Sequence, residues 1–231
     1  MVAWAQQACR SNRPQQHARR LELISRFARF WAAFDPRTEV PPAGLLGPAY
    51  SARPPVHIYT PRQITRLLAM TRHLHWAHPW WTLTFKTLFG LLAATGIRLG
   101  EVICLQDRDV DWSAGEMTVR QGKSGRPRHL PLHATTQQAL RRYRQARPKC
   151  LPGSHPAFFV QPHGQPLKSW QVRDGFRYAR QRLGWQAWRP RPRLHDLRHT
   201  FAVRCLLRWQ GQRLDFGKSQ RWAGVLFKGS A

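Results

Sequence analysis

The stretch RLHDLRHTF, residues 193–201, carries a histidine and an arginine three positions apart and runs directly into an apolar helical pattern. Positions i and i+3 share one face of an α-helix, so His195 and Arg198 are predicted to point at the same target. Such a pair suits a phosphate, because the guanidinium holds two oxygens while the imidazole gives or takes a proton. In an arginine-rich chain, the same spacing also fits the charged start of a helix that has no chemistry.

Two further stretches change the balance between these interpretations. TGIRLGE, residues 95–101, follows a long apolar run and places Arg98 after a Thr-Gly break, and GKSG, residues 122–125, lies between two strand-like runs. In their wording, order and separation, the three stretches resemble the tyrosine recombinase (phage integrase) family. The resemblance covers roughly residues 60–210.

The resemblance implies site-specific DNA recombination or integration without a metal ion or another cofactor. In that chemistry a tyrosine attacks the phosphorus atom, which leaves a 3′-phosphotyrosyl link and a free 5′-hydroxyl. Two guanidiniums neutralise the charge that builds on the phosphate oxygens, and an ammonium protonates the leaving oxygen. The fixed donors of such a site are each worth around 10²–10³ in rate.

The resemblance also assigns the catalytic roles to residues of this chain. Arg98 and Arg198 would clamp the phosphate. Lys123 would be the general acid, and His195 would assist proton transfer. For Lys123, an ordinary solvated lysine in a hairpin turn remains the alternative.

Other residues would support this site. Glu101 would hold an arginine in place, and His199 would pack behind the catalytic groups. Trp222 is the candidate for a His or Trp that the family keeps beyond this helix, although no Leu-Gly-His motif surrounds it and a plain core or surface tryptophan is the alternative. Contacts with DNA phosphates are expected from three arginines: Arg126, Arg128 and Arg193.

No residue is assigned as the nucleophile. The four tyrosines, at positions 50, 59, 143 and 178, all precede His195, whereas the family's tyrosine follows it. We therefore expect a chain that is cut short or shifted out of frame near Gln210 and that is inactive alone, unless a partner supplies the tyrosine. The competing function class is a non-catalytic protein that binds duplex DNA, as a decoy or regulator at recombination sites.

The charge of the chain points to nucleic acid as the partner. The 231 residues include 38 Lys and Arg against 11 Asp and Glu, a formal charge of +27, and only six of the 38 are Lys. Such a surplus must lie on the surface and favours a polyanion, with an RNA-binding structural protein as the alternative. The expected partner is double-stranded DNA, bound by a homo-tetramer or a mixed multimer. Eleven Trp and 42% hydrophobic residues indicate a real core.

The cysteines and the apolar runs indicate a compartment. The four Cys, at 9, 104, 150 and 205, form no zinc spacing, and Cys104 and Cys205 fall on apolar faces, which suits core thiols in a reducing cytosol. No signal peptide is visible, and the longest apolar run, around residues 83–94, is too short to span a bilayer. We expect a cytoplasmic, nucleoid-associated protein without a membrane segment.

The predicted fold is α+β and mainly α: a catalytic domain with a small antiparallel sheet, preceded by a partial helical DNA-clamping domain. The expected divisions are a clamp segment at 1–40, a Pro-rich linker at 41–56, the catalytic domain at 57–210 and an atypical tail at 211–231. Residues 1–14 are expected to lack structure. Helices are predicted at 15–34, from a capping Thr60, at 80–94, 135–147, 169–183 and 195–210, and strands within 109–132 and at 158–160.

Overall fold

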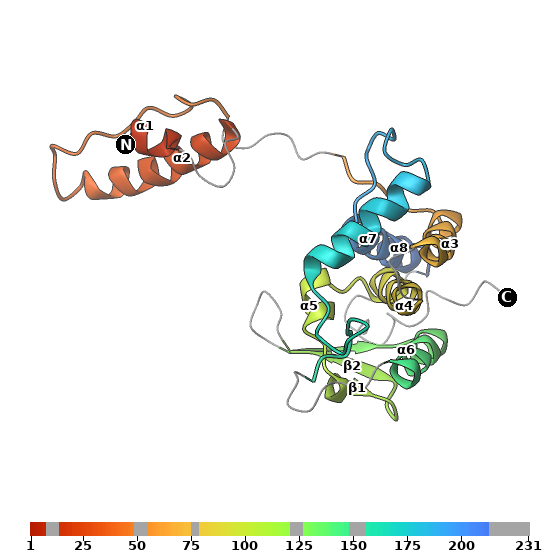
Figure 1. The fold of residues 1–231 in the computed structure, drawn as a ribbon. Coiled ribbons are helices and arrows are strands. Elements are labelled where there is room, and N and C mark those ends of the chain that lie inside the picture. The colour runs from red at the N-terminus through yellow and green to blue at the C-terminus, as the bar shows by residue number, and fades with distance from the viewer. Residues whose placement is uncertain (8–13, 49–54, 75–78, 121–126, 148–155, 213–231) are drawn as a thin grey trace. The chain divides into compact units, whose positions relative to one another are not determined.

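The computed structural model describes residues 1–7, 14–48, 55–74, 79–120, 127–147 and 156–212. The chain divides into two compact units, Met1–Pro54 and Pro55–Ala231 (Figure 1). The described parts are mainly helical with one small antiparallel sheet, which confirms the predicted fold class. None of the helices in these ranges is both long and apolar enough to cross a membrane.

The first unit contains helices α1 (Val2–Gln6) and α2 (Pro14–Trp31). The prediction that residues 1–14 lack structure was wrong for α1. The guanidinium of Arg20 lies 4.2 Å from the centre of the Trp4 ring and donates to the Gln7 carbonyl at 3.0 Å. So short a helix is marginal alone. The contacts between α1 and α2 stabilise α1. The sequence pattern of residues 1–14 could not predict these contacts, because they involve residues of α2.

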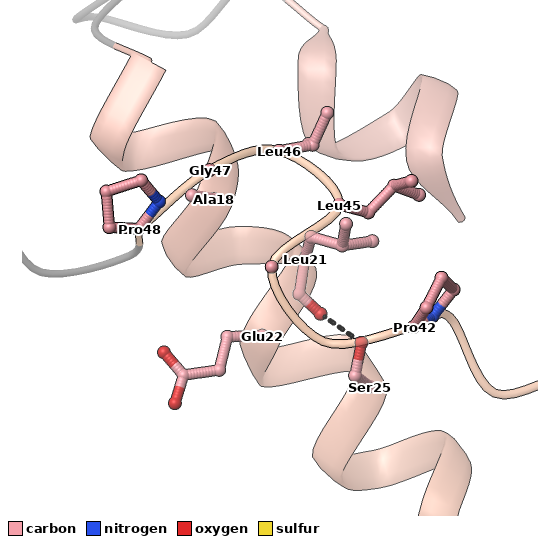
Figure 2. Close-up of a pocket in the computed structure, with 10 residues that line it drawn as sticks. Ala18, Leu21, Glu22, Ser25, Pro42, Leu45, Leu46, Gly47 and Pro48 are labelled. Atoms are coloured by element: carbon pink, nitrogen blue, oxygen red, sulfur yellow. Dashed lines mark hydrogen bonds between the residues drawn. The ribbon is translucent and has the colours of Figure 1, made fainter.

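The segment after α2 folds back along that helix and leaves an open pocket of about 270 Å³ (Figure 2). Within α2, the Ser25 hydroxyl donates to the Leu21 carbonyl at 2.8 Å, so this polar group is satisfied inside its own helix. The pocket is lined by Ala18, Leu21, Glu22, Ser25, Pro42, Gly44, Leu45, Leu46, Gly47 and Pro48.

Helix α4 (Trp80–Thr95) is the centre of the second unit. It packs against α3 (Pro61–Met70), α6 (Ala134–Ala146) and α8 (Asp196–Gln212). Twelve of its residues are buried, because apolar side chains occupy nearly every face of the helix. The sequence predicted this buried helix, and the structure confirms it.

Helix α3 begins with the capping box that the sequence predicted. The Thr60 hydroxyl accepts from the Gln63 backbone N–H at 3.2 Å, and the Gln63 side chain accepts from the Thr60 N–H at 2.9 Å. Pro61 occupies the first helical position, where its missing N–H has no partner to lose. The start of the second unit is therefore fixed by its local sequence.

The sheet consists of β1 (Val110–Asp111), β2 (Glu116–Val119) and β3 (Arg128–Pro131), antiparallel and in that order. In its register, Val110 faces Met117 and Thr118 faces His129. The three predicted strands are thus confirmed. The remaining elements are α5 (Leu99–Ile103), α7 (Ser169–Arg182) and two 3₁₀ helices, η1 (Thr71–His73) and η2 (Asp107–Asp109).

The predicted strand at 158–160 was wrong. Within this segment only Val160 forms an isolated bridge, with Pro166. The Phe158 N–H donates to the Leu105 carbonyl at 2.7 Å, and the Val160 N–H donates to the Tyr143 hydroxyl at 3.0 Å. These two N–H groups therefore bond separate parts of the chain, so the segment forms no ladder with a strand among the described residues.

Two smaller expectations also need correction. Cys104 follows α5 and is exposed, and Cys205 is half-buried, so neither is a fully buried core thiol. Helix α8 begins at Asp196, which leaves His195 in the turn just before the helix. The apolar spacing around the two cysteines indicated a helical face without showing where that face ends.

Candidate active site

Arg98 is placed by the turn that joins α4 to α5. Helix α4 ends at Gly96, whose φ of 61° is left-handed, and Arg98 is the residue that caps α5. The Arg98 backbone N–H donates to Glu101 Oε2 at 3.0 Å, and its Nη1 donates to Glu101 Oε1 at 3.0 Å. One carboxylate therefore fixes both the backbone and the guanidinium of Arg98.

Helix α8 brings Arg198 to the same turn. A Cβ atom on Gly96 would lie 2.5 Å from Cδ1 of Phe201, so the turn tolerates no larger residue against α8. The Arg198 Nη1 donates to the Gly96 carbonyl. Arg198 therefore bonds the carbonyl of a residue that precedes Arg98 by only two positions.

The electrostatics of Arg198 show that the charged groups gather. Burial lowers the pKa of Arg198, and the charges of Arg98 and Arg128 lower it further, while Glu101 raises it. The hydrogen bonds agree with this, because Arg98 and Arg128 both bond Glu101, and Arg198 bonds the turn two residues before Arg98. Three guanidiniums and one carboxylate therefore occupy one region, which carries an excess of positive charge.

Glu101 is the buried anion of this region. It is 8% exposed and accepts from Arg128 Nη1 at 3.1 Å and from Arg128 Nη2, in addition to the two hydrogen bonds from Arg98. Burial by itself would raise its pKa, but the hydrogen bonds from Arg128 and Arg98 outweigh burial and lower it to about 2. Glu101 is therefore ionised throughout the physiological range.

The two histidines lie edge to face. The ring centres of His195 and His199 are 4.8 Å apart and their planes meet at 89°. Burial lowers the pKa of His195, and the neighbouring charges of His199 and Arg198 lower it further, against the opposing effect of Asp196. His195 is consequently neutral near pH 7 and is able to accept a proton.

Arg193 lies three residues before Asp196, the first residue of α8, and forms an ion pair with it. Its Nη2 donates to Asp196 Oδ1 at 2.9 Å, and its backbone N–H donates to Asp196 Oδ2 at 2.9 Å. Asp196 is fully buried, so the pair fixes the loop that leads into the helix. In this structure, Arg128 and Arg193 each bond a carboxylate.

Two of the described tyrosines are buried and bond main-chain carbonyls. Tyr59 and Tyr143 are 1% and 0% exposed, and their hydroxyls donate to the carbonyls of Arg193 at 3.0 Å and Val160 at 3.4 Å. Burial raises the pKa of Tyr59, which makes its phenolate harder to form. Tyr178 is half-buried, and Tyr50 lies outside the described residues.

Three of the predicted site residues, Lys123, Arg126 and Trp222, lie outside the described residues. Within the described ranges, no group of three or more His, Cys, Asp or Glu side chains is placed to hold a metal ion. The sequence reasoning missed the bond between Arg128 and Glu101. The available signal was composition: where 38 cations share 11 carboxylates, one buried carboxylate is apt to serve more than one arginine.

Known proteins resemble this chain over most of its length. The profile of the Phage integrase family matches residues 58–209. The putative integrase/recombinase y4rB of Sinorhizobium fredii is 37% identical over 224 residues, which are 93% of this chain and 70% of that protein. Tyrosine recombinase XerC of Roseiflexus castenholzii is 33% identical over 156 residues, which are 64% of this chain and 46% of that protein.

A solved structure supports the same conclusion for the fold. The Tn1549 transposon integrase, in complex with circular intermediate DNA, superposes with a TM-score of 0.66 at 17% identity, over 97% of this chain and 75% of that chain. The family profile spans the turn of Arg98, the sheet and the start of α8. This chain belongs to the phage integrase family of tyrosine recombinases.

Proposed function

We propose that this chain acts in site-specific DNA recombination or integration, by cleaving and rejoining DNA strands through a phosphotyrosine link. The observation that carries the proposal is the convergence of Arg98 and Arg198, which are joined through Gly96 and coupled by charge. Two guanidiniums around one position suit the oxygens of a single scissile phosphate.

The proposed roles follow the geometry and the resemblance together. Arg98 and Arg198 hold the phosphate, and neutral His195 takes part in proton transfer. Glu101 holds Arg98, and His199 packs on the ring of His195. The resemblance to the family's motifs supports Lys123 as the general acid and Trp222 as a further weak candidate. It also supports phosphate contacts from Arg126, Arg128 and Arg193.

The proposed partner is duplex DNA. A charge of +27 supports a polyanion, and the Tn1549 integrase was solved with DNA. We propose a homo-tetramer or mixed multimer on DNA and a nucleoid-associated location. Residues 57–210 would form the catalytic domain, residues 1–40 would clamp DNA, 41–56 would link these two parts, and 211–231 would form an atypical tail.

The chain alone is proposed to lack strand cleavage, because no tyrosine follows Arg198 in its sequence and Tyr59 and Tyr143 are buried. To test this, a duplex that the chain binds is selected from a random library and nicked. The chain is incubated with the nicked duplex, and the products are separated on a denaturing gel. No covalent protein–DNA adduct is expected. Adding an intact recombinase tests supply of the tyrosine in trans. A stable adduct with this chain alone would contradict the proposed inactivity.

The alternative is a non-catalytic DNA-binding protein, a decoy or regulator at recombination sites. Substitution of Arg98 or Arg198 by Ala separates the two functions, with Arg62→Ala, on an exposed part of α3, as the charge-matched control. If the two arginines form a phosphate site, the Arg98→Ala and Arg198→Ala variants each lose clearly more affinity for a selected duplex than the Arg62→Ala variant does. Equal small losses for all three variants would favour a simple electrostatic footprint.

A further inference from the structure

Glu101 has no acceptor capacity left to spare. A carboxylate has about four lone-pair positions, and Glu101 receives four hydrogen bonds: two from Arg98 and two from Arg128. The two from Arg128 form a fork, one to each oxygen, which is the strongest geometry for this pair of groups. The Arg98 side chain makes only one of the four.

This division leaves Arg98 available for another anion. The Arg98 side chain is 40% exposed, and Nη1 makes the single hydrogen bond to Glu101 that its guanidinium forms within the described residues. A guanidinium has five N–H donors, so most of its donors remain for a ligand. The Arg128 side chain is 34% exposed, and both of its terminal nitrogens are used on Glu101.

The charges lead to the same assignment. Arg98, Arg128 and Arg198 carry three positive charges, and Glu101 carries one negative charge. Without Arg128, Glu101 would cancel one of only two remaining guanidiniums, and its freed lone pairs would draw Arg98 into a closed pair. An anion would then compete with Glu101 for Arg98.

We propose that Arg128 is a positioning residue, which occupies the Glu101 carboxylate in a bidentate pair and so leaves the Arg98 guanidinium free for a phosphodiester. This inference rests on the proposed function, because it takes Arg98 as a phosphate ligand. It differs from the expectation that Arg128 itself contacts DNA phosphates. Arg128 acts through Glu101, so its effect depends on the presence of that carboxylate.

A double-mutant cycle tests this dependence, with inorganic phosphate as the probe. Phosphate is titrated into the full chain while the guanidinium Nε–H signals of Arg98 and Arg198 are followed by NMR. In the presence of Glu101, Arg128→Gln is expected to weaken phosphate binding at Arg98 about tenfold, the size of one charge-assisted interaction. In the Glu101→Gln background, the same substitution should change binding less than about twofold.

The chain offers a matched control. Arg120 precedes residues 121–126 and forms an ion pair with Asp109. Arg128 follows the same residues and forms its ion pair with Glu101. Arg120→Gln removes the same charge and an ion pair with a buried carboxylate, and it should leave phosphate binding at Arg98 within about twofold. Arg128→Lys, which keeps the charge but loses the fork, should fall between wild type and Arg128→Gln.

Each outcome decides one question. Equal losses from Arg128→Gln in both backgrounds would overturn the positioning role and make Arg128 a direct phosphate ligand. If phosphate leaves Arg98 and Arg198 unchanged in the wild-type chain, the proposed phosphate site fails. The carboxylate signal of Glu101 still tests the pair in that case: Arg128→Gln should raise the pKa of Glu101 more than Arg98→Gln does, and an equal or smaller rise overturns the role of Arg128.

Discussion

The guanidinium of Arg198 donates to the main-chain carbonyl of Gly96, across 102 residues of sequence. The acceptor belongs to the backbone, so its presence does not depend on which side chain occupies position 96. The left-handed turn, however, directs this carbonyl toward α8, and only a residue without Cβ fits there. The site therefore depends on a backbone conformation as much as on its charged side chains.

Gly96→Ala should destabilise the protein by about 1–3 kcal/mol, because alanine resists the left-handed φ and its Cβ would overlap Phe201. Urea denaturation followed by circular dichroism measures the loss. Gly100→Ala is the control, since a Cβ there meets nothing within 4 Å. A Gly96→Ala protein as stable as the Gly100→Ala protein would show that the turn is not constrained as described.

Replacement of the cap of α3 has a smaller expected effect. Thr60→Ala removes the hydroxyl that accepts from the Gln63 N–H and should cost about 1 kcal/mol. Thr65→Ala, on the same helix, removes a hydroxyl that only donates to the Pro61 carbonyl and should change stability by less than about 0.5 kcal/mol. The comparison of urea midpoints is decisive, and equal midpoints would contradict the role of the cap.

Glu101 should make stability depend on pH in acid. Its pKa of about 2 in the folded protein is lower than the value near 4.3 for an unfolded chain, so its contribution is complete above about pH 4.3 and is lost as the pH falls through 2. Glu101→Gln should therefore be clearly less stable than wild type at about pH 5, with a gap that narrows toward about pH 2. The exposed Glu39→Gln is the control. A gap that is constant with pH would argue against the low pKa.

His195 should titrate below the ordinary histidine value of 6.5, because burial and the charges of His199 and Arg198 oppose its protonation. Protonation is then easier in the unfolded chain, so this residue reduces stability as the pH falls below about 6.5. Imidazole NMR signals give the midpoint directly. Arg198→Gln and His199→Gln should each move it upward, whereas Arg62→Gln on α3 should not. A midpoint that both substitutions leave unchanged would contradict the effect of these two charges on His195.

Much of the fold could be predicted from local patterns. The capping box at Thr60, the apolar run of α4 and the break at Gly96 each lie within a few residues of sequence, and the structure confirms all three elements. The segment at 158–160 was mistaken for a strand, because its backbone partners are Leu105 and Tyr143, which no local pattern identifies. Helix α1 was missed because its stability comes from α2.

The site divides in the same way. The residues Arg98, His195 and Arg198 could be selected from their motifs, and Glu101 was selected because it follows Arg98 by three positions. The bond from Arg128 to Glu101 crosses 27 residues and depends on how β3 lies against α5, so spacing could not predict it. The pairing of Arg193 with buried Asp196 was equally hidden, because a sequence shows charge and not burial.

Tyr59 precedes α3, yet it forms two hydrogen bonds with α8 and a third with the loop that leads into α8. Its N–H donates to the Thr200 hydroxyl at 2.9 Å, its carbonyl accepts from Arg204 at 2.9 Å, and its own hydroxyl reaches the Arg193 carbonyl. A shortened expression fragment that starts at the capping Thr60 would lose all three of these hydrogen bonds and the buried Tyr59 ring. Any recombinant version of the second unit should therefore include Tyr59 with its backbone N–H.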